Sequence, residues 1–204
     1  MISRRDFCAA AVVAAVGASP PRLGLAAERS PDATISEYYD TLLSTMKEGP
    51  KLGFSGRSER LAPAIRRTFN LPLMTRLMVG PQWTSLMPEQ QQQLIAAFSD
   101  FSIATYAGRF DDYSGERFQV DSKLTPTANG TIVHTKLVKR DGEAVQLDYL
   151  MREGDAGWQI VDVYLSGTVS ELATRRSEFS SVMRRGGADA LVDALQKKTA
   201  QLRS

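Results

Sequence analysis

Turn residues and alternating apolar residues that define a β-sheet occur in VKRDGEAVQLDYLMREGDAGWQIVDVYL, from Val138 to Leu165. Asp141-Gly142 is the two-residue signal of a tight β-hairpin, and Gly154-Asp155-Ala156-Gly157 marks a longer turn. Between these turns apolar residues alternate with polar ones, as in strands that bury one face. Working outward, we predict four strands near residues 116–124, 130–140, 143–152 and 157–166, joined as an antiparallel meander.

The alternation is clear in the third predicted strand and ambiguous in the fourth. Four apolar residues share one face of the third strand: Val145, Leu147, Tyr149 and Met151. Two apolar sets compete for the inner face of the fourth: Trp158 and Ile160 against Val161, Val163 and Leu165. The pattern therefore leaves open which face of the sheet points inward.

Helical periodicity precedes and follows the strands. The predicted helices run from Asp32 to the Gly49-Pro50 stop, over one or two short segments to Phe69, from Leu71 to Gly80, from about Pro88, from Ser170 to Gly186, and in a last segment beyond Gly187. The helix from about Pro88 is apolar over so wide an arc that it is either central to the core or lines a cavity. Segregated helices and strands predict a single α+β domain over residues 28–204, with helices on one face of a four-stranded antiparallel sheet.

The first residues have the layout of an export signal. Ser-Arg-Arg-Asp-Phe is followed by an apolar run from Cys8 to Ala18 and by the small residues Leu25-Ala26-Ala27. An apolar run of 11 residues is shorter than the roughly 20 that a membrane-spanning helix needs. We expect cleavage after residue 27 and no transmembrane anchor in the mature chain. The paired arginines fit a twin-arginine signal, and an ordinary secretory signal stays open.

Removal of residues 1–27 makes the chain formally neutral. Three arginines and one aspartate leave, so that Lys plus Arg falls from 25 to 22 and Asp plus Glu from 23 to 22. A neutral mature chain gives no ground for nucleic-acid binding. The single cysteine, Cys8, leaves as well, and His134 is the single histidine. We therefore predict no disulfide, no metal site and no cofactor.

Catalytic motifs are missing from the sequence, with one alternative left open. The nucleophile-elbow, phosphate-loop and dinucleotide-binding motifs do not occur. Three strand carboxylates, Asp121, Asp148 and Asp162, are the remaining candidates for general acid–base chemistry in a cone-shaped, isomerase-like fold acting on a hydrophobic substrate. Carboxylates paired for structural reasons are the commoner case.

Three longer motifs, spread over about Leu61 to Leu195, resemble one known family. They are FNLPLMTRLMVGPQW (69–83), FSDFSIATYAGRFDDYSG (98–115) and GWQIVDVYLSGTVSELATRRSEF (157–179). Their order and spacing resemble the MlaC-like family of periplasmic phospholipid-binding proteins, also called toluene-tolerance auxiliary proteins. Within that family the wording RLMVGPQW and TYAGRFDDYSGERF is most similar to the hopanoid-associated branch, HpnM.

The resemblance implies a function as a periplasmic lipid carrier and not as an enzyme. Lipid tails would lie in an apolar pocket between sheet and helices, and the carrier would exchange phospholipid or hopanoid with an inner-membrane ABC-type transporter and an outer-membrane lipoprotein complex. Carried over onto this sequence, the pocket candidates are Leu73, Met74, Leu77, Met78, Phe98, Phe101, Tyr106, Phe110, Val145, Leu147, Tyr149, Met151, Trp158 and Val163. Asp162 and Arg176 occupy motif positions for which we predict a structural ion pair.

Overall fold

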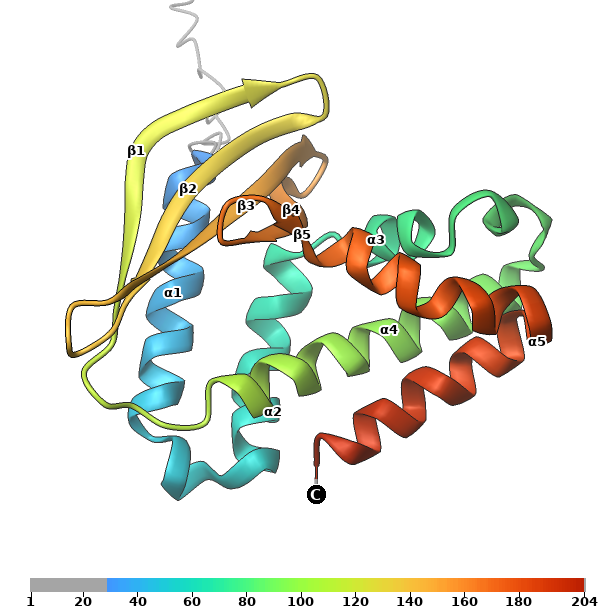
Figure 1. Cartoon of the computed structure of the whole chain (residues 1–204), viewed down its shortest axis with the longest axis horizontal. Helices are drawn as coiled ribbons and strands as arrows, with labels where there is room; N and C mark the ends of the chain where they lie inside the picture. Colours follow the sequence, from blue (N-terminus) through green and yellow to red (C-terminus); the bar gives the residue numbers. More distant parts are fainter. Residues whose placement is uncertain (1–28, 204) are drawn as a thin grey trace, which may run out of the picture.

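Five antiparallel strands form one sheet, in the order in which they occur along the chain (Figure 1). They are β1 (Arg117–Thr127), β2 (Gly130–Val138), β3 (Ala144–Gly154), β4 (Gly157–Leu165) and β5 (Val169–Ser170). The structure is a computed structural model that describes residues 29–203. The predictions for residues 1–27, including the export signal and Cys8, lie outside the described residues.

The prediction of four strands is wrong, because the chain reverses directly after β4 and adds β5. Ser166 and Gly167 both have positive φ, 52° and 73°, and the Thr168 N–H donates to the Leu165 carbonyl at 3.2 Å. Positive φ at both central residues is the signature of the hairpin turns that match strand twist. The two residues of β5 then pair with Tyr164 and Leu165, a strand too short to produce a periodic pattern.

A β-bulge in β4 resolves the competition between its two apolar sets. Ile160 stands opposite Met151 and Asp162 opposite Leu150, so that Val161 is an extra residue in the ladder. A bulge shifts the alternation by one residue. Ile160 before the bulge and Val163 after it therefore both belong to the core. On the inner face of the sheet, the apolar set of Ile160 applies before the bulge and the set of Val163 applies after it.

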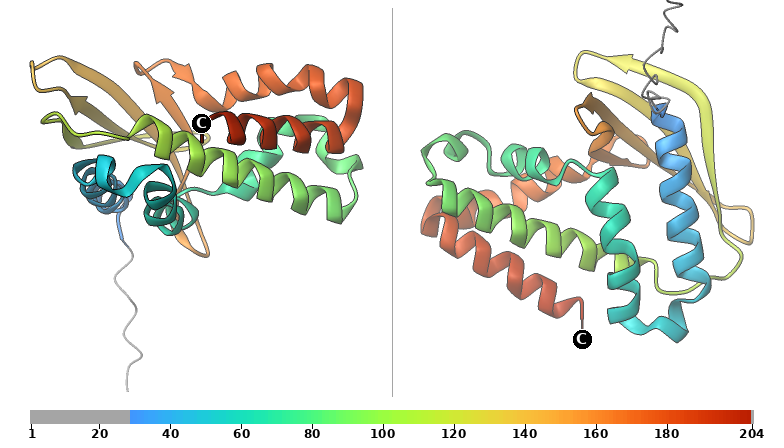
Figure 2. Two further views of the ribbon diagram at one scale, coloured as in Figure 1. Left: turned by 90° about the horizontal axis from the view of Figure 1, so that it is seen from below. Right: turned by 180° about the vertical axis from the view of Figure 1, so that it is seen from behind.

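The N-terminal helices lie against the sheet. Helix α1 (Pro31–Lys47) contacts β1 and β2, and its Tyr39 ring stacks on Phe118 with centroids 4.2 Å apart. Helix α2 (Gly49–Thr68) changes direction at Gly53, where φ is 62°. Figure 2 shows α1 and α2 on one side of the sheet, as the segregated pattern predicted.

The remaining helices project away from the sheet (Figure 2). They are α3 (Leu71–Val79), the 3-10 turn η1 (Gly80–Ser85), α4 (Pro88–Arg109) and α5 (Glu171–Gln201). The chain of α5 folds back on itself at Gly187, where φ is 67°, so the two helices predicted for this region are the two arms of α5. Helix α4 packs mainly against α5, α2 and α3. None of the helices in residues 29–203 is long and apolar enough to cross a membrane.

The connection between α2 and α3 joins the helices to the sheet. The Asn70 backbone N–H donates to the Ile160 carbonyl at 2.9 Å, and the Asn70 side-chain amide donates to Gln159 at 3.1 Å. The Asn70 side chain also accepts from the Leu73 N–H and so caps α3. These bonds hold Phe69 at the boundary between the sheet and the helices, where the cavity described next begins.

Candidate functional site

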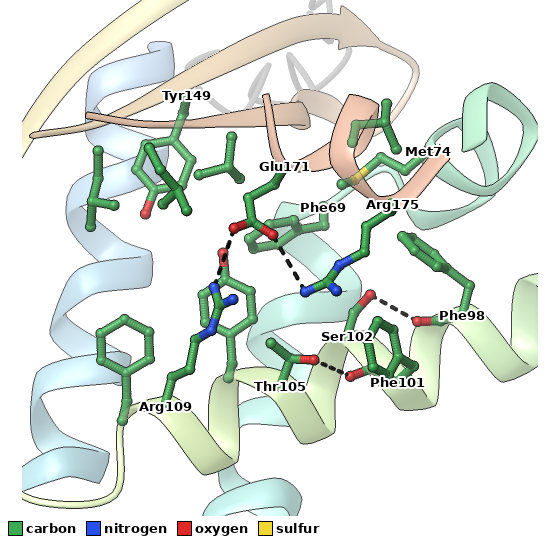
Figure 3. Close-up of a pocket in the computed structure, with 16 residues that line it drawn as sticks. Phe69, Met74, Phe98, Phe101, Ser102, Thr105, Arg109, Tyr149, Glu171 and Arg175 are labelled. Atoms are coloured by element: carbon green, nitrogen blue, oxygen red, sulfur yellow. Dashed lines mark hydrogen bonds and ion pairs between the residues drawn. The ribbon is translucent and has the colours of Figure 1, made fainter. Parts of the chain in front are cut away.

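An apolar cavity of about 100 Å³ lies between the inner face of the sheet and α4 (Figure 3). Side chains from β3, β4, α4 and the first turns of α3 and α5 surround it. The lining residues are Phe69, Met74, Phe98, Phe101, Ser102, Thr105, Tyr106, Arg109, Phe110, Leu147, Tyr149, Val163, Leu165, Glu171, Leu172 and Arg175.

The sheet wall of the cavity consists of two cross-strand pairs. Tyr149 lies opposite Val163 and Leu147 lies opposite Leu165, and all four side chains line the cavity. Val163 and Leu165 reach this face because the bulge at Val161 shifts the alternation of β4. The inner face of the sheet is thus the face that carries Leu147 and Tyr149.

The helical wall is one stripe of α4. Phe98, Phe101, Ser102, Thr105 and Arg109 recur at spacings of three and four residues and therefore share one face of the helix. The hydroxyls of Ser102 and Thr105 donate to the carbonyls of Phe98 and Phe101 at 2.8 Å. Because these hydroxyls are bonded within their own helix, this wall offers a ligand chiefly carbon atoms.

The tyrosines at the cavity and behind it stay protonated to unusually high pH. Burial is the largest cause that raises the pKa of Tyr149 well above its ordinary value, and it does the same for Tyr38 and Tyr106. Burial also raises the pKa of Tyr39 to about 12, although the hydrogen bonds with Thr135 and Tyr149 oppose the shift. The Tyr39 hydroxyl is hydrogen-bonded to Thr135 at 2.5 Å and to Tyr149 at 3.1 Å.

The three charged lining residues lie next to one another, and we call them the charged rim: Arg109, Glu171 and Arg175 (Figure 3). The Glu171 carboxylate lies between the two guanidinium groups, 3.6 Å from Arg109 and 3.5 Å from Arg175. Arg109 ends α4 and the other two residues begin α5. The rim therefore spans the two helices beside the cavity.

Eight of the fourteen predicted pocket residues line the cavity: Met74, Phe98, Phe101, Tyr106, Phe110, Leu147, Tyr149 and Val163. The other six lie elsewhere: Leu73, Leu77, Met78, Val145, Met151 and Trp158. Met78 and Met151 are buried in the general core, and Leu77 is 39% exposed. Helix α3 presents only its first turn to the cavity, so residues one or two turns further on cannot reach it.

Six of the eight remaining lining residues fall into two groups, according to whether a sequence pattern indicates them. Ser102, Thr105 and Arg109 continue the helical stripe of Phe98, and that spacing identifies them once polar residues are admitted to a cavity wall. Glu171, Leu172 and Arg175 reach the cavity because α5 begins directly after β5 and its first turns lie beside α4 and β4. No local pattern contains that information.

The predicted ion pair between Asp162 and Arg176 is replaced by other contacts and does not occur among the ion pairs of residues 29–203. The Asp162 carboxylate accepts hydrogen bonds from the N–H groups of Val163 at 2.8 Å and Leu172 at 3.1 Å, and from the Ser170 hydroxyl at 2.6 Å. The Arg176 guanidinium lies beside Gly80. Asp162 therefore fixes the start of α5.

The three strand carboxylates considered for catalysis do not meet at the cavity. Asp148 faces away from it and accepts hydrogen bonds from His134 at 3.0 Å and Gln146 at 2.8 Å. The other ring nitrogen of His134 is hydrogen-bonded to Thr125 at 2.8 Å. The order Thr125, His134, Asp148 is that of a nucleophile, base and acid, on the sheet face opposite the cavity. No local sequence pattern indicates this chain of contacts, because Thr125, His134 and Asp148 lie on three strands that are brought side by side only in the sheet.

Comparison with known proteins identifies the family. The chain is similar to the intermembrane phospholipid transport system binding protein MlaC of Haemophilus influenzae, 23% identical over 186 residues, 86% of this chain and 85% of that protein. Its fold is similar to the structure of a phospholipid-binding protein from Ralstonia solanacearum in complex with a phospholipid, with a TM-score of 0.75, 27% identity, and coverage of 86% of this chain and all of that chain. The family described as MlaC protein matches residues 36–197, and the chain therefore belongs to the MlaC family.

Proposed function

We propose that the protein is a periplasmic carrier that binds phospholipid by enclosing its acyl chains in the cavity between the sheet and α4. The observation that carries the proposal is the composition of that cavity, whose walls are aromatic and aliphatic and whose charges are confined to the rim. Membership of the MlaC family supports it. So do the names of the two similar proteins, a phospholipid transport binding protein and a structure in complex with a phospholipid.

The energetics of lipid extraction favour an enclosed site. Burial of each CH₂ group is worth roughly 0.8 kcal/mol, so a sixteen-carbon chain leaving a bilayer needs on the order of 10 kcal/mol of replacement burial. A few hydrogen bonds of about 1 kcal/mol each do not supply that. Apolar walls contributed by Phe69, Phe98, Phe101, Leu147 and Val163 do.

The cavity must widen to admit an acyl chain. Its volume of about 100 Å³ is below the roughly 300–1,000 Å³ of pockets that hold small organic ligands. Helix α4 packs mainly on other helices, so its separation from the sheet breaks side-chain contacts and spares the β-ladder. We therefore expect lipid to enter between α4 and the β3–β4 hairpin.

Two finer parts of the proposal concern the route and the cargo. The carrier exchanges lipid with an inner-membrane ABC-type transporter and an outer-membrane lipoprotein complex, as the family resemblance implies. A hopanoid is the alternative cargo, suggested by the wording RLMVGPQW that resembles the HpnM branch.

The test is lipid identification by mass spectrometry on protein purified from the periplasm, followed by uptake from liposomes. Co-purified phospholipid, and its transfer from vesicles, are the expected results. Clean protein that takes up no lipid from any vesicle would reject the carrier, and hopanoid as the main bound lipid would reject the phospholipid cargo.

A further inference from the structure

The charged rim stands out because its three residues are partly withdrawn from water beside an apolar cavity. The side chains of Arg175 and Glu171 are 19% and 21% exposed, while that of Arg109 is 51% exposed. Charged groups this close to apolar walls carry a desolvation cost that neighbouring charges must offset. The rim holds two cations and one carboxylate, so one positive charge is left over within it.

The contacts of Glu171 to the two arginines are long. Its carboxylate oxygens lie 3.6 Å from Arg109 Nη1 and 3.5 Å from Arg175 Nη2, whereas charge-assisted N–H···O bonds are usually about 2.7–2.9 Å. Glu171 therefore offsets part of the positive charge of the two guanidinium groups, but it does not satisfy their hydrogen-bonding capacity. Another anion with better geometry can take its place.

Arg175 is held in position independently of Glu171. Its Nη1 donates to Glu178 at 3.0 Å, and its guanidinium carbon lies 5.0 Å from the centre of the Phe101 ring. Lys198 and Arg175 outweigh burial and lower the pKa of Glu178, which keeps this anchor ionised at neutral pH. The guanidinium is thus preorganised over the aromatic floor of the cavity, with one edge facing Glu171 (Figure 3).

A phosphodiester suits the position between these two arginines. Guanidinium groups match carboxylate and phosphate oxygens in the same fork geometry. A phosphodiester carries one negative charge, which offsets the one positive charge left over in the rim. In a phospholipid the phosphate is only a few bonds from the acyl chains, which places it at the rim when the chains fill the cavity.

We propose that Arg109 and Arg175 form the binding site for the phosphate of the bound lipid, and that the Glu171 carboxylate occupies this site until the phosphate displaces it. This inference rests on the proposed function as a lipid carrier. It assigns the cargo to lipids with a phosphate head group over neutral lipids. The returning carboxylate favours release, since it restores both ion pairs when the phosphate leaves.

The experiment compares two labelled lipids with identical chains, a phospholipid and a diacylglycerol, offered to the protein in vesicles of the same bulk lipid. The unchanged protein is expected to take up the phospholipid about tenfold more than the diacylglycerol. Arg175→Gln lowers phospholipid uptake to the level of diacylglycerol and so removes the preference. Arg109→Gln has a smaller effect in the same direction, because this side chain is half exposed. For the same reason the substitution is not expected to impair folding.

Glu171→Gln gives the opposite result, a several-fold gain in phospholipid uptake, because the competing carboxylate is gone. Arg60→Gln is the matched control, since Arg60 pairs with Glu48 at 2.8 Å outside the cavity lining. Its preference stays that of the unchanged protein. Inorganic phosphate alone is expected not to compete at millimolar concentration.

Three contrary outcomes distinguish the phosphate site, a site for a free anion and the carrier function. Equal losses of both lipids in the arginine variants would overturn the phosphate site and leave the carrier intact. Competition by inorganic phosphate as strong as by phospholipid would assign the rim to a free anion. Uptake of neither lipid by the unchanged protein would instead reject the carrier function itself.

Discussion

The hydroxyl groups of Tyr39 and Tyr149 are hydrogen-bonded at 3.1 Å, so that helix α1 is tied to a residue of the cavity wall. Thr135 extends the link, because its hydroxyl is bonded to Tyr39 and donates to the Leu147 carbonyl. A polar chain therefore runs behind the apolar cavity. Its burial has consequences for stability at alkaline pH.

We expect the free energy of unfolding to fall as the pH rises from 10 to about 12. Unfolded tyrosines lose their protons near pH 10, while burial keeps Tyr39 protonated up to about pH 12. The unfolded state then binds fewer protons than the folded state, so stability is complete below pH 10 and is lost through this window. For Tyr39 alone the loss is about 2–3 kcal/mol.

Urea denaturation at a series of pH values checks this expectation, with Tyr39→Phe as the comparison. At pH 8 the variant is less stable by about 1–3 kcal/mol, because buried hydroxyls lose a partner. Between pH 10 and 12 it loses less additional stability than the unchanged protein. Parallel pH profiles would contradict the assignment of the shift to Tyr39.

Asp162→Asn is expected to lower the free energy of unfolding by about 1–3 kcal/mol. The carboxylate accepts three hydrogen bonds, including those from Ser170 and Leu172 at the start of α5, and an amide offers only one oxygen in its place. Ser170→Ala, which removes the N-cap oxygen bonded to the Ala173 N–H, costs about 1 kcal/mol. Thermal or urea denaturation measures both changes.

A double-mutant cycle separates this capping role from the ion pair that the sequence suggested. If Asp162 acts through backbone and hydroxyl donors, Arg176→Gln couples to Asp162→Asn by less than about 0.5 kcal/mol. A larger coupling energy would restore the ion pair. Loss of lipid uptake by Asp162→Asn at unchanged stability would instead point to a chemical role for the carboxylate.

Leu165→Asp is expected to abolish lipid uptake, because it puts a charge into the sheet wall of the cavity. The matched control is Leu77→Asp. Leu77 also belongs to the pocket set that the sequence predicted, but it is 39% exposed and outside the cavity lining. Vesicle uptake by folded protein, verified by circular dichroism, measures both. Equal behaviour of the two variants would show that lipid binds elsewhere.

Gly80→Ala is expected to lower the free energy of unfolding by about 1–3 kcal/mol. Gly80 follows α3 with φ 75° and ψ −143°, a conformation that side chains rarely adopt, and a Cβ atom would lie 3.0 Å from Arg176 Nη2. Gly154→Ala serves as the control, since a Cβ there meets nothing within 4 Å. Denaturation curves that shift equally for both variants would contradict the explanation.

The sequence predicted eight of the sixteen residues that line the cavity. The Phe98–Phe101–Tyr106 face of α4 and the Leu147–Tyr149 face of β3 follow from regular periods. Val163 was predicted too, although the alternation could not say why it and Ile160 point the same way. The bulge at Val161 supplies the reason, and it forms in response to the partner strand.

From the sequence alone came the order of the helices and of β1 to β4 and the turns between these strands, because turn chemistry and hydrophobic periodicity act over a few residues. Longer motifs supplied the resemblance to the family. Only the tertiary structure decided which groups meet. It placed Arg109 beside Glu171 and Arg175, tied Asp162 to α5, and set Arg176 against Gly80. The contacts of Arg109 with Glu171 and of Arg176 with Gly80 join residues far apart in the chain, and their geometry depends on how α5 packs against α3 and α4.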